Sequence, residues 1–244
     1  MDFTDKRVLV TGGSRGIGFS VANAFIDAGA HVAINGRTDD SVAAAIAALG
    51  EGDCRVAAPG DIGTVSGCES AVETATDAFG GLDILVNSAG GALVRKPLVP
   101  LPAASPPWAK DLQDFNTITT EDEWSSMMDA NLLCTFLATR AVGPHMIEQR
   151  KGKVINISSM TGAKGYPYHV LYCVTKAGGM MFTQSLALEW APYHVNVNAI
   201  APGYLATQMT DIYMQDEPMT RRFVGAIPLG RLCEPREVGL LAVY

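Results

Sequence analysis

A tyrosine and a lysine stand four residues apart, at Tyr172 and Lys176, in a stretch with a strongly helical pattern. Side chains at this spacing lie on one face of a helix. A free phenol has a pKa near 10 and is a poor base at neutral pH, but a neighbouring ammonium favours the phenolate. The pair therefore indicates a proton donor or acceptor in which Lys176 lowers the pKa of Tyr172. About 0.2 such pairs arise by chance in a chain of this composition, so the interpretation needs other residues.

Two serines, Ser158 and Ser159, follow a β-branched run that we predict to be a strand over residues 153–157. Ligands bind at the carboxyl edge of open α/β sheets. A serine hydroxyl at that edge could donate a hydrogen bond to a substrate carbonyl oxygen as negative charge develops there. An isolated serine pair is more often a hydroxyl-capped turn, so this motif also depends on its context.

A glycine-rich segment, Thr11-Gly12-Gly13-Ser14-Arg15-Gly16-Ile17-Gly18, lies between the first predicted strand and the first predicted helix. Glycines permit a tight turn and close approach of a ligand, and the free N–H groups at a helix start attract a pyrophosphate. The glycine spacing alone occurs by chance in about one chain in four of this composition. Its position between strand and helix favours a dinucleotide site over a plain glycine-rich turn.

The end of the second predicted strand carries a cation instead of a carboxylate. A site that prefers NAD(H) places Asp or Glu there to accept a hydrogen bond from the ribose 2′-hydroxyl, whereas this chain has Arg37. A guanidinium can bind a 2′-phosphate bidentately, and Arg15 could close on the same group. Asp39 and Asp40 follow, but they are placed to cap the next helix. We therefore expect NADP(H) to be preferred, while NAD(H) stays open, as does the simpler view of both arginines as solvated cations.

Short apolar runs alternate with alanine-rich helical patterns, which favours a parallel sheet with right-handed crossovers. The predicted strands are residues 7–10, 31–34, 54–57, 84–86, 153–157 and 196–199. The predicted helices are residues 18–28, 40–49, 66–79, 121–149 and 172–191. No linker or repeat divides the chain. We expect an α/β fold over residues 1–244, a single-domain Rossmann-type doubly wound parallel sheet flanked by helices.

Two segments interrupt this alternation. Residues 91–120 hold five prolines and read as a long loop, which is usually functional or mobile. Residues 203–228 hold Met209, Met214 and Met219 in an irregular substrate-loop region, where soft side chains could repack around a ligand or simply fill the core.

The order of these motifs resembles the short-chain dehydrogenase/reductase family, from Lys6 to the end of the chain. The glycine segment is similar to the family's cofactor loop, and Asp61-Ile62 resembles the acidic pair that contacts the adenine. Asn87-Ser88-Ala89-Gly90 resembles its Asn-Asn-Ala-Gly strand end, with Ser88 in place of the second asparagine. Pro202-Gly203-x3-Thr207 resembles the segment that holds the nicotinamide carboxamide, where Leu205 offers backbone groups.

The resemblance implies four catalytic residues, which are Asn131, Ser159, Tyr172 and Lys176. Asn131 matches a helix asparagine that supports a proton relay through Lys176. Ser159, not Ser158, lies thirteen residues before Tyr172, which is the family's common spacing. The implied cofactor-binding residues are Gly12, Ser14, Arg15, Gly16, Ile17, Gly18, Arg37, Asp61, Ile62, Asn87, Ala89, Gly90, Tyr172, Lys176, Pro202, Gly203, Leu205 and Thr207.

The activity implied is hydride transfer between NADP(H) and a carbonyl or secondary alcohol substrate. The types of member that look most similar are 3-oxoacyl reductases and sugar or polyol dehydrogenases, and the sequence does not separate them. Two alternatives stay open, a nicotinamide-binding sensor or scaffold without catalysis and an epimerase or dehydratase that uses the same tyrosine and lysine. Relatives pair the helices at 121–149 and 172–191 between subunits, so a homodimer or homotetramer is expected.

The chain departs from the family pattern in two places. The loop after Gly90 is longer than usual, at the point where substrate enters in relatives. The chain also stops at Tyr244, before a further strand that contains Asp-Gly-Gly in family members. We therefore expect a sheet that lacks its last C-terminal strand and exposes an unpaired edge.

Composition excludes several other classes of protein. The formal net charge of −7 disfavours nucleic-acid binding, and no apolar run is long enough to cross a membrane. Five scattered cysteines and four isolated histidines predict no disulfide framework and no metal site, in a cytoplasmic protein. Arg95 and Lys96 could attract an acidic substrate, although solvated loop cations are the simpler interpretation. Arg150, Lys151 and Lys153 could likewise meet an acidic acyl carrier or only complement a helix C-terminus.

Overall fold

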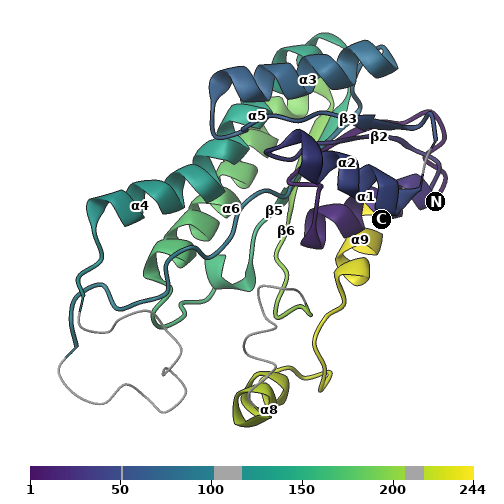
Figure 1. Ribbon diagram of the computed structural model, residues 1–244. Helices are drawn as coiled ribbons and strands as arrows, with labels where there is room; N and C mark the ends of the chain where they lie inside the picture. The colour runs from purple at the N-terminus through teal and green to yellow at the C-terminus, as the bar shows by residue number, and fades with distance from the viewer. Residues whose placement is uncertain (51, 102–116, 207–216) are drawn as a thin grey trace.

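A six-stranded parallel sheet forms the centre of the fold (Figure 1), in the order β3-β2-β1-β4-β5-β6. The computed structural model of the chain describes residues 1–50, 52–101, 117–206 and 217–244. The strands are β1 (Arg7–Thr11), β2 (His31–Ile34), β3 (Arg55–Ala57), β4 (Ile84–Asn87), β5 (Gly152–Ile157) and β6 (Val195–Ile200). Each neighbouring pair is parallel, and each strand lies within one residue at either end of its predicted range.

Helices cover both faces of the sheet. The helices are α1 (Gly16–Asp27), α2 (Asp39–Leu49), α3 (Val65–Phe79), α4 (Glu121–Met128), α5 (Cys134–Glu148), α6 (Val170–Trp190), α8 (Glu217–Gly225) and α9 (Pro235–Val243). Val8 and Val10 of β1 pack in a core cluster with α1, α2 and α9, whereas Leu9 packs with α3, α5 and α6. Successive side chains of a strand point to opposite faces, so both faces of these central strands are apolar. The doubly wound architecture expected from the sequence is therefore present.

The strand order places a crevice beside β1. From β1 the chain winds outward through β2 and β3, and it then returns to the other side of β1 with β4, β5 and β6. The direction of winding thus reverses between β1 and β4. Open α/β sheets bind ligands at such a switch point, outside the carboxyl ends of the strands.

The helix predicted over residues 121–149 contains a turn that the sequence did not indicate. It begins with a capping box, in which the Thr120 and Glu123 side chains bond each other's backbone N–H groups. After α4, a π-helical turn (η2, Asp129–Leu133) precedes α5. Such turns insert one extra residue into a helix and occur often at functional sites. This one contains Asn131.

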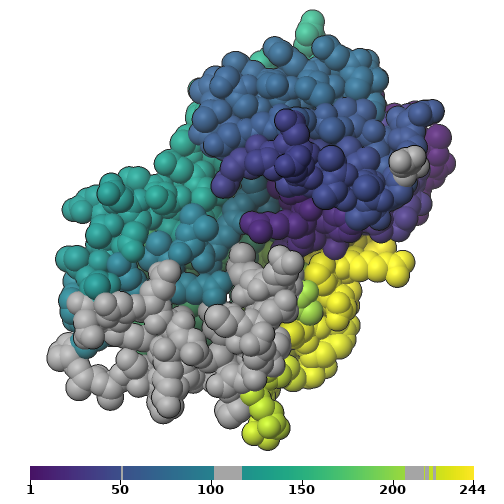
Figure 2. Space-filling model, viewed as in Figure 1, coloured from purple at the N-terminus to yellow at the C-terminus, as the bar shows by residue number. Residues whose placement is uncertain are grey.

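The C-terminal part differs from the prediction of an irregular segment over residues 203–228. Helix α8 lies within that range, and Leu205 forms a parallel bridge with Cys233. Helix α9 packs along α1, so the yellow end of the chain lies against its purple beginning (Figures 1 and 2). Among the described strands, β6 lies at the edge of the sheet, next to β5. No helix within the described residues is long and apolar enough to cross a membrane.

Candidate active site

One large cavity of about 1500 Å³ opens at the carboxyl ends of the strands. Each strand is followed by residues that line it: Gly12 after β1, Asn35 after β2, Gly60 after β3, Ser88 after β4, Ser158 after β5 and Pro202 after β6. The parallel sheet therefore brings together motifs that lie up to about two hundred residues apart in sequence.

The glycine segment forms a tight wall of this cavity. Gly12 and Gly16 adopt left-handed φ values of 62° and 59°. A Cβ atom at Gly12 would lie 2.8 Å from the Ala89 Cα, and one at Gly18 would overlap the Gly12 carbonyl. Ser14 and Ile17 line the cavity beside these glycines. Arg15, at the N-cap of α1, makes no capping bond with its side chain, and the first turn of α1 contains no acidic residue. The N-terminus of α1 is therefore suited to an anion.

Two arginines line the same part of the cavity. Arg15 and Arg37 are both exposed and both line the cavity. The cap of α2 is Thr38, whose hydroxyl accepts a hydrogen bond from the Ser41 N–H at 3.3 Å. The expectation that Asp39 and Asp40 cap this helix was wrong, because both lie in its first turn.

Asn35 is a cavity residue that sequence reasoning missed. Its side chain is fully buried, and its Nδ2 donates hydrogen bonds to the carbonyls of Ala58 at 2.9 Å and Gly60 at 3.1 Å. The Gly12 N–H lies 3.4 Å from its Oδ1. Asn35 therefore joins the ends of β1, β2 and β3. A polar residue directly after the buried apolar run at residues 32–34 was the available signal.

Of the residues after β3 and at the end of β4 that are predicted to bind the cofactor, most line the cavity. Asp61 and Ile62 line the cavity, and so do Ala89 and Gly90. Ser88 lines it too, although its hydroxyl oxygen is buried and has no hydrogen-bond partner in the described structure.

Asn87, by contrast, is not among the cavity residues. Its Nδ2 donates to the Thr139 hydroxyl and to the Asn156 Oδ1, both at 2.9 Å. The Asn156 Nδ2 in turn donates to the Thr183 hydroxyl at 2.9 Å. This buried network joins β4 and β5 to α5 and α6, so the Asn87 side chain supports the site from behind.

The two serines after β5 have different partners. The Ser158 hydroxyl donates to the Lys176 carbonyl at 3.1 Å and so attaches the strand end to α6. The Ser159 Oγ accepts hydrogen bonds from the Thr161 N–H at 3.2 Å and the Thr161 hydroxyl at 3.0 Å. A further hydrogen bond links the Ser159 hydroxyl to Tyr172, so Ser159, and not Ser158, is the serine in contact with the predicted proton donor.

Tyr172 and Lys176 lie one helical turn apart on α6, and both line the cavity. The Lys176 Nζ lies 5.6 Å from the centre of the Tyr172 ring and donates to the Ile157 carbonyl at 3.0 Å. Only 7% of Lys176 is exposed, and burial lowers its pKa from 10.5 to about 8.

The pKa of Tyr172 shifts in the direction opposite to the one expected. Burial raises the pKa of the phenol above its ordinary value, and the nearby Ser159 hydroxyl and Arg95 charge oppose this only in part. In the protein alone, loss of water around the phenol therefore outweighs stabilisation of the phenolate by its neighbours. The sequence showed the spacing of Tyr172 and Lys176 but not this burial.

Asn131, unlike the other three predicted catalytic residues, does not line the cavity. Its Oδ1 accepts the Gly91 N–H at 2.9 Å, and its Nδ2 donates to the carbonyls of Gly91 at 2.9 Å and Met127 at 3.1 Å. The side chain is buried and is not among the cavity residues, although Gly91 and Ala130 are. Asn131 therefore fixes the first residues of the segment that follows β4.

The last predicted motif, at residues 202–207, follows β6. Pro202, Gly203 and Leu205 line it, and the Pro202 carbonyl accepts the Met160 N–H at 2.9 Å. Thr207 lies outside the described residues.

The two basic residues of the long loop are not a solvated pair. Lys96 is 8% exposed, and its Nζ forms an ion pair with Glu123 at 2.7 Å. Arg95 is half-buried and lines the cavity, together with Tyr166 and His169.

These features fit a nicotinamide dinucleotide laid along the strand ends. The left-handed glycines allow close approach, the start of α1 is suited to a pyrophosphate, and the buried Ser88 hydroxyl has no partner among the described residues. Among the described residues, no group of three or more His, Cys, Asp or Glu side chains could hold a metal ion.

Comparison with known proteins agrees with this geometry. A family model of short chain dehydrogenases matches residues 6–218. A 3-oxoacyl-[acyl-carrier-protein] reductase from Vibrio cholerae is 36% identical, over 100% of this chain and 91% of the relative. A 5-keto-D-gluconate 5-reductase from Escherichia coli is 33% identical, over 98% of this chain and 87% of the relative.

Solved structures give the same result. The crystal structure of a candidate short-chain alcohol dehydrogenase from Sinorhizobium meliloti superposes with a TM-score of 0.84 at 37% identity, over 99% of this chain and 89% of that chain. The chain therefore belongs to the short chain dehydrogenase family, NAD(P)-dependent oxidoreductases that act on CH–OH and C=O groups.

Proposed function

We propose that the protein interconverts a carbonyl compound and a secondary alcohol with NADP(H), and that Ser159, Tyr172 and Lys176 carry the chemistry. The observation that supports this most is that these three side chains line the cavity that also contains the glycine segment. Both hydroxyls therefore lie where a substrate would meet a dinucleotide bound along the strand ends.

Each side chain has a separate task. When bound, the dinucleotide supplies a hydride to the carbonyl carbon or accepts one from the alcohol carbon. The Ser159 hydroxyl donates a hydrogen bond to the substrate oxygen and stabilises the negative charge that develops there. Tyr172 gives its proton to that oxygen during reduction and removes it during oxidation. A raised pKa keeps Tyr172 protonated at neutral pH, which suits the reductive direction.

Lys176 and Asn131 support these two hydroxyls. We propose that the Lys176 ammonium binds the nicotinamide ribose and that its charge opposes the effect of burial on Tyr172 during oxidation. A relay of protons from Asn131 through Lys176 and a positioned water stays a prediction, and the Asn131 side chain itself bonds Gly91 and Met127. We assign Asn131 the task of positioning Gly91 at the cavity wall.

The preference for NADP(H) rests on Arg15 and Arg37. Both line the cavity at the end of the dinucleotide site that follows β1 and β2. Neither Asp39 nor Asp40 is among the cavity residues, so these carboxylates are not available to a ribose hydroxyl there. A guanidinium pair suits a 2′-phosphate.

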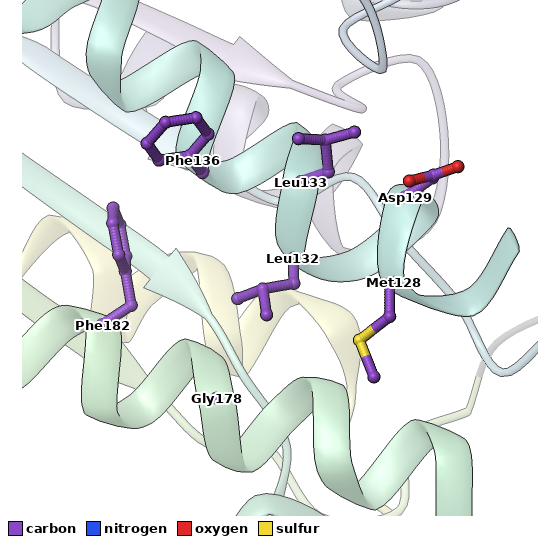
Figure 3. A pocket seen from close by; sticks show the side chains of 7 residues that line it. All are labelled: Met128, Asp129, Leu132, Leu133, Phe136, Gly178 and Phe182. Atoms are coloured by element: carbon purple, nitrogen blue, oxygen red, sulfur yellow. The ribbon is translucent and has the colours of Figure 1, made fainter. Parts of the chain in front are cut away.

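An apolar groove outside this cavity supports assembly into oligomers (Figure 3). The groove encloses about 480 Å³ between η2 and α6. Met128 and Leu132 extend toward α6, and Gly178 leaves room there for the Leu132 side chain. Phe182 of α6 points toward α5, which carries Phe136. The exposed side of α6 continues this apolar face with Val170, Val174, Met181 and Leu188, which are 43%, 42%, 60% and 81% exposed.

Residues spaced in this way form one stripe along a helix. A stripe of exposed apolar side chains beside an apolar groove matches the same surface of a second copy related by a two-fold axis. We therefore propose a homodimer or homotetramer, in a cytoplasmic protein whose described cysteines are all unpaired.

A panel of substrates tests the activity and the cofactor preference together. The full chain is mixed with 3-oxoacyl thioesters, ketoses, keto acids and polyols, and the change in reduced-nicotinamide absorbance is followed with the phosphorylated and unphosphorylated cofactors in parallel. We expect turnover of at least one compound, with kcat/KM higher for NADPH than for NADH. Arg37→Gln should lower kcat/KM for NADPH about ten- to hundredfold, as loss of a charge-assisted bond predicts.

The outcomes separate the two parts of the proposal. Lys153→Gln removes a cation at the amino end of β5, opposite the cavity, and should match the wild type. A large preference for NADH would overturn the argument from Arg37 alone. No turnover of any carbonyl compound or alcohol with either cofactor would overturn the proposed activity and favour a non-catalytic binding protein.

A further inference from the structure

The part of the cavity around the catalytic hydroxyls contains a cation that the proposed chemistry does not use. Arg95 lines the cavity together with Ser159 and Tyr172. Its positive charge lowers the pKa of Tyr172 and of His169, so it lies close enough to act on both. A positive charge beside the reacting oxygen is a strong influence on which substrates bind.

The segment that carries Arg95 is firmly held on both sides. Val94 is 8% exposed and packs in a small core cluster with Met127 and Leu171. The buried Lys96 forms an ion pair with the partly exposed Glu123, and its Nζ lies 3.4 Å from the Thr117 hydroxyl. Arg95 thus projects from an anchored backbone, which suits a residue that must hold a ligand in one orientation.

The charge of the cavity differs from that of the whole chain. The chain has a formal net charge of −7, but the cationic residues that line the cavity outnumber the acidic ones in the described part. The cationic residues are Arg15, Arg37, Arg95 and Lys176, and the acidic residues are Asp61 and Asp129. Arg15 and Arg37 lie at the end proposed for the 2′-phosphate, whereas Arg95 follows Val94, whose core cluster packs against Tyr172.

The imidazole beside Arg95 adds an acceptor rather than a second cation. The His169 Nδ1 lies 2.9 Å from the Pro167 carbonyl oxygen, which only accepts hydrogen bonds, so Nδ1 carries the proton. Burial lowers the pKa of His169, and the Arg95 charge lowers it further. The ring is therefore neutral at pH 7, and its Nε2 can accept a hydrogen bond from a substrate hydroxyl.

We propose that Arg95 binds an anionic group of the substrate and that the substrate is a small carbonyl compound bearing a carboxylate, with the corresponding hydroxy acid as its reduced form. This inference rests on the proposed function and names its substrate class. A guanidinium binds a carboxylate through charge-assisted hydrogen bonds. The Arg95 charge also stabilises the negative charge that develops on the neighbouring substrate oxygen.

Matched pairs of substrates test this assignment. Each pair consists of a keto acid and the ketone that has CH2OH in place of its carboxylate: 5-keto-D-gluconate with L-sorbose, 4-oxopentanoate with 5-hydroxypentan-2-one, and acetoacetate with 4-hydroxybutan-2-one. Fructose 6-phosphate with fructose is included as a phosphate arm. We expect kcat/KM to be about tenfold or more higher for the acid of at least one pair.

Variants at Arg95 then separate charge from shape. Arg95→Gln should lower kcat/KM for the acid about ten- to hundredfold, mainly through KM, while the neutral partner changes less than about threefold. Arg95→Lys should retain part of the preference for the acid, because it keeps the positive charge but loses the planar set of guanidinium donors. Lys153→Gln serves as the control for removal of one positive charge far from the cavity.

A binding measurement keeps the proposal testable without turnover. In the presence of NADP+, gluconate should raise the melting temperature of the wild type but not of Arg95→Gln, and uncharged D-glucitol should raise neither. Equal loss of both members of every pair in Arg95→Gln overturns the proposal, as does a preference for the neutral partners. Turnover of the phosphorylated ketose alone overturns the carboxylate assignment.

The two proposals fail in different ways. Reduction of neutral carbonyl compounds only, with no stabilisation by gluconate, leaves the proposed function in place and removes the role of Arg95. No turnover of any compound, together with stabilisation by gluconate that depends on Arg95, removes the proposed activity and keeps the anion site.

Discussion

The Lys176 ammonium lies 3.0 Å from the carbonyl oxygen of Ile157, the last residue of β5. This bond joins α6 to the strand end that carries Ser159, and it places a cation where little water reaches. Burial lowers the pKa of Lys176 from 10.5 to about 8, so the buried charge opposes folding. A group kept in an unfavourable state by the fold is typical of functional sites.

Replacing this lysine by an apolar residue should stabilise the protein while it removes activity. At pH 7 Lys176 is charged in both the folded and unfolded states, and its pKa shift corresponds to a cost of about 3 kcal/mol. Lys176→Met removes that cost but leaves the Ile157 carbonyl without its donor, worth about 1 kcal/mol. We expect the free energy of unfolding to rise by about 1–2 kcal/mol at pH 7.

The free energy of unfolding should depend on pH in a way that tests this cost of burying the Lys176 charge. Between pH 8 and 10.5 the unfolded wild type binds more protons than the folded one, so the contribution of Lys176 to the free energy of unfolding increases with pH. The advantage of Lys176→Met should therefore shrink across this range. Thermal melts of both proteins at pH 7 and pH 10 measure it. A variant that is less stable than the wild type at pH 7 would contradict the argument.

Removing the phenolic hydroxyl should stop proton transfer without loss of cofactor binding. Tyr172→Phe keeps the ring beside Lys176 but has no proton to exchange with the substrate oxygen. We expect kcat to fall about 10²- to 10⁴-fold, while the dissociation constant for NADPH, measured by fluorescence, stays within about threefold. Tyr193→Phe, on an exposed tyrosine outside the cavity, is the control. Near-native turnover by Tyr172→Phe would exclude its proposed role.

Truncating Asn131 should loosen the wall of the cavity at Gly91. Asn131→Ala removes three hydrogen bonds and leaves the Gly91 N–H and two carbonyls without this partner. We expect a loss of about 1–3 kcal/mol in the free energy of unfolding and a lower kcat/KM, measured by urea unfolding and by assay. Asn131→Asp should be no better, because its carboxylate would face two carbonyl oxygens.

A matched substitution separates this effect from a general loss of an asparagine. Asn23→Ala removes only an exposed contact with Asp27 at 3.3 Å and should change stability by less than about 0.5 kcal/mol. If Asn131→Ala lowers the free energy of unfolding as little as Asn23→Ala does, the hydrogen bonds between Asn131 and Gly91 do not stabilise the protein.

The sequence predicted what depends on periodicity and on order along the chain. Apolar runs indicated the central strands, because buried parallel strands require apolar side chains on both faces, whereas the edge strand β6 alternates buried valines with exposed asparagines. Parallel connection then brings every strand's carboxyl end to one edge, so the glycine segment and the Ser159 and Tyr172 motifs had to meet there. The structure places these residues around one cavity.

What the sequence missed depends on contacts between distant segments. The partners of Asn87 lie on β5 and α5, and those of Asn35 lie beyond β3, so neither role is visible in local pattern. The π-helical turn at Asn131 interrupts a stretch predicted as one helix, and its sequence DANLL contains neither glycine nor proline. The direction of the Tyr172 pKa shift follows from how deeply the ring is buried, which spacing along a helix does not indicate.

A charge placed on the exposed apolar stripe of α6 should separate the subunits. Met181 is 60% exposed at the middle of this stripe, so Met181→Glu leaves the core of one subunit intact but would bury an unpaired carboxylate in a two-fold interface. We expect the wild type to sediment as a dimer or tetramer at micromolar concentration and the variant as a monomer. Leu229→Glu, on a 79% exposed leucine outside the stripe, should sediment like the wild type. A wild type that is strictly monomeric under these conditions would show that this apolar face serves another purpose.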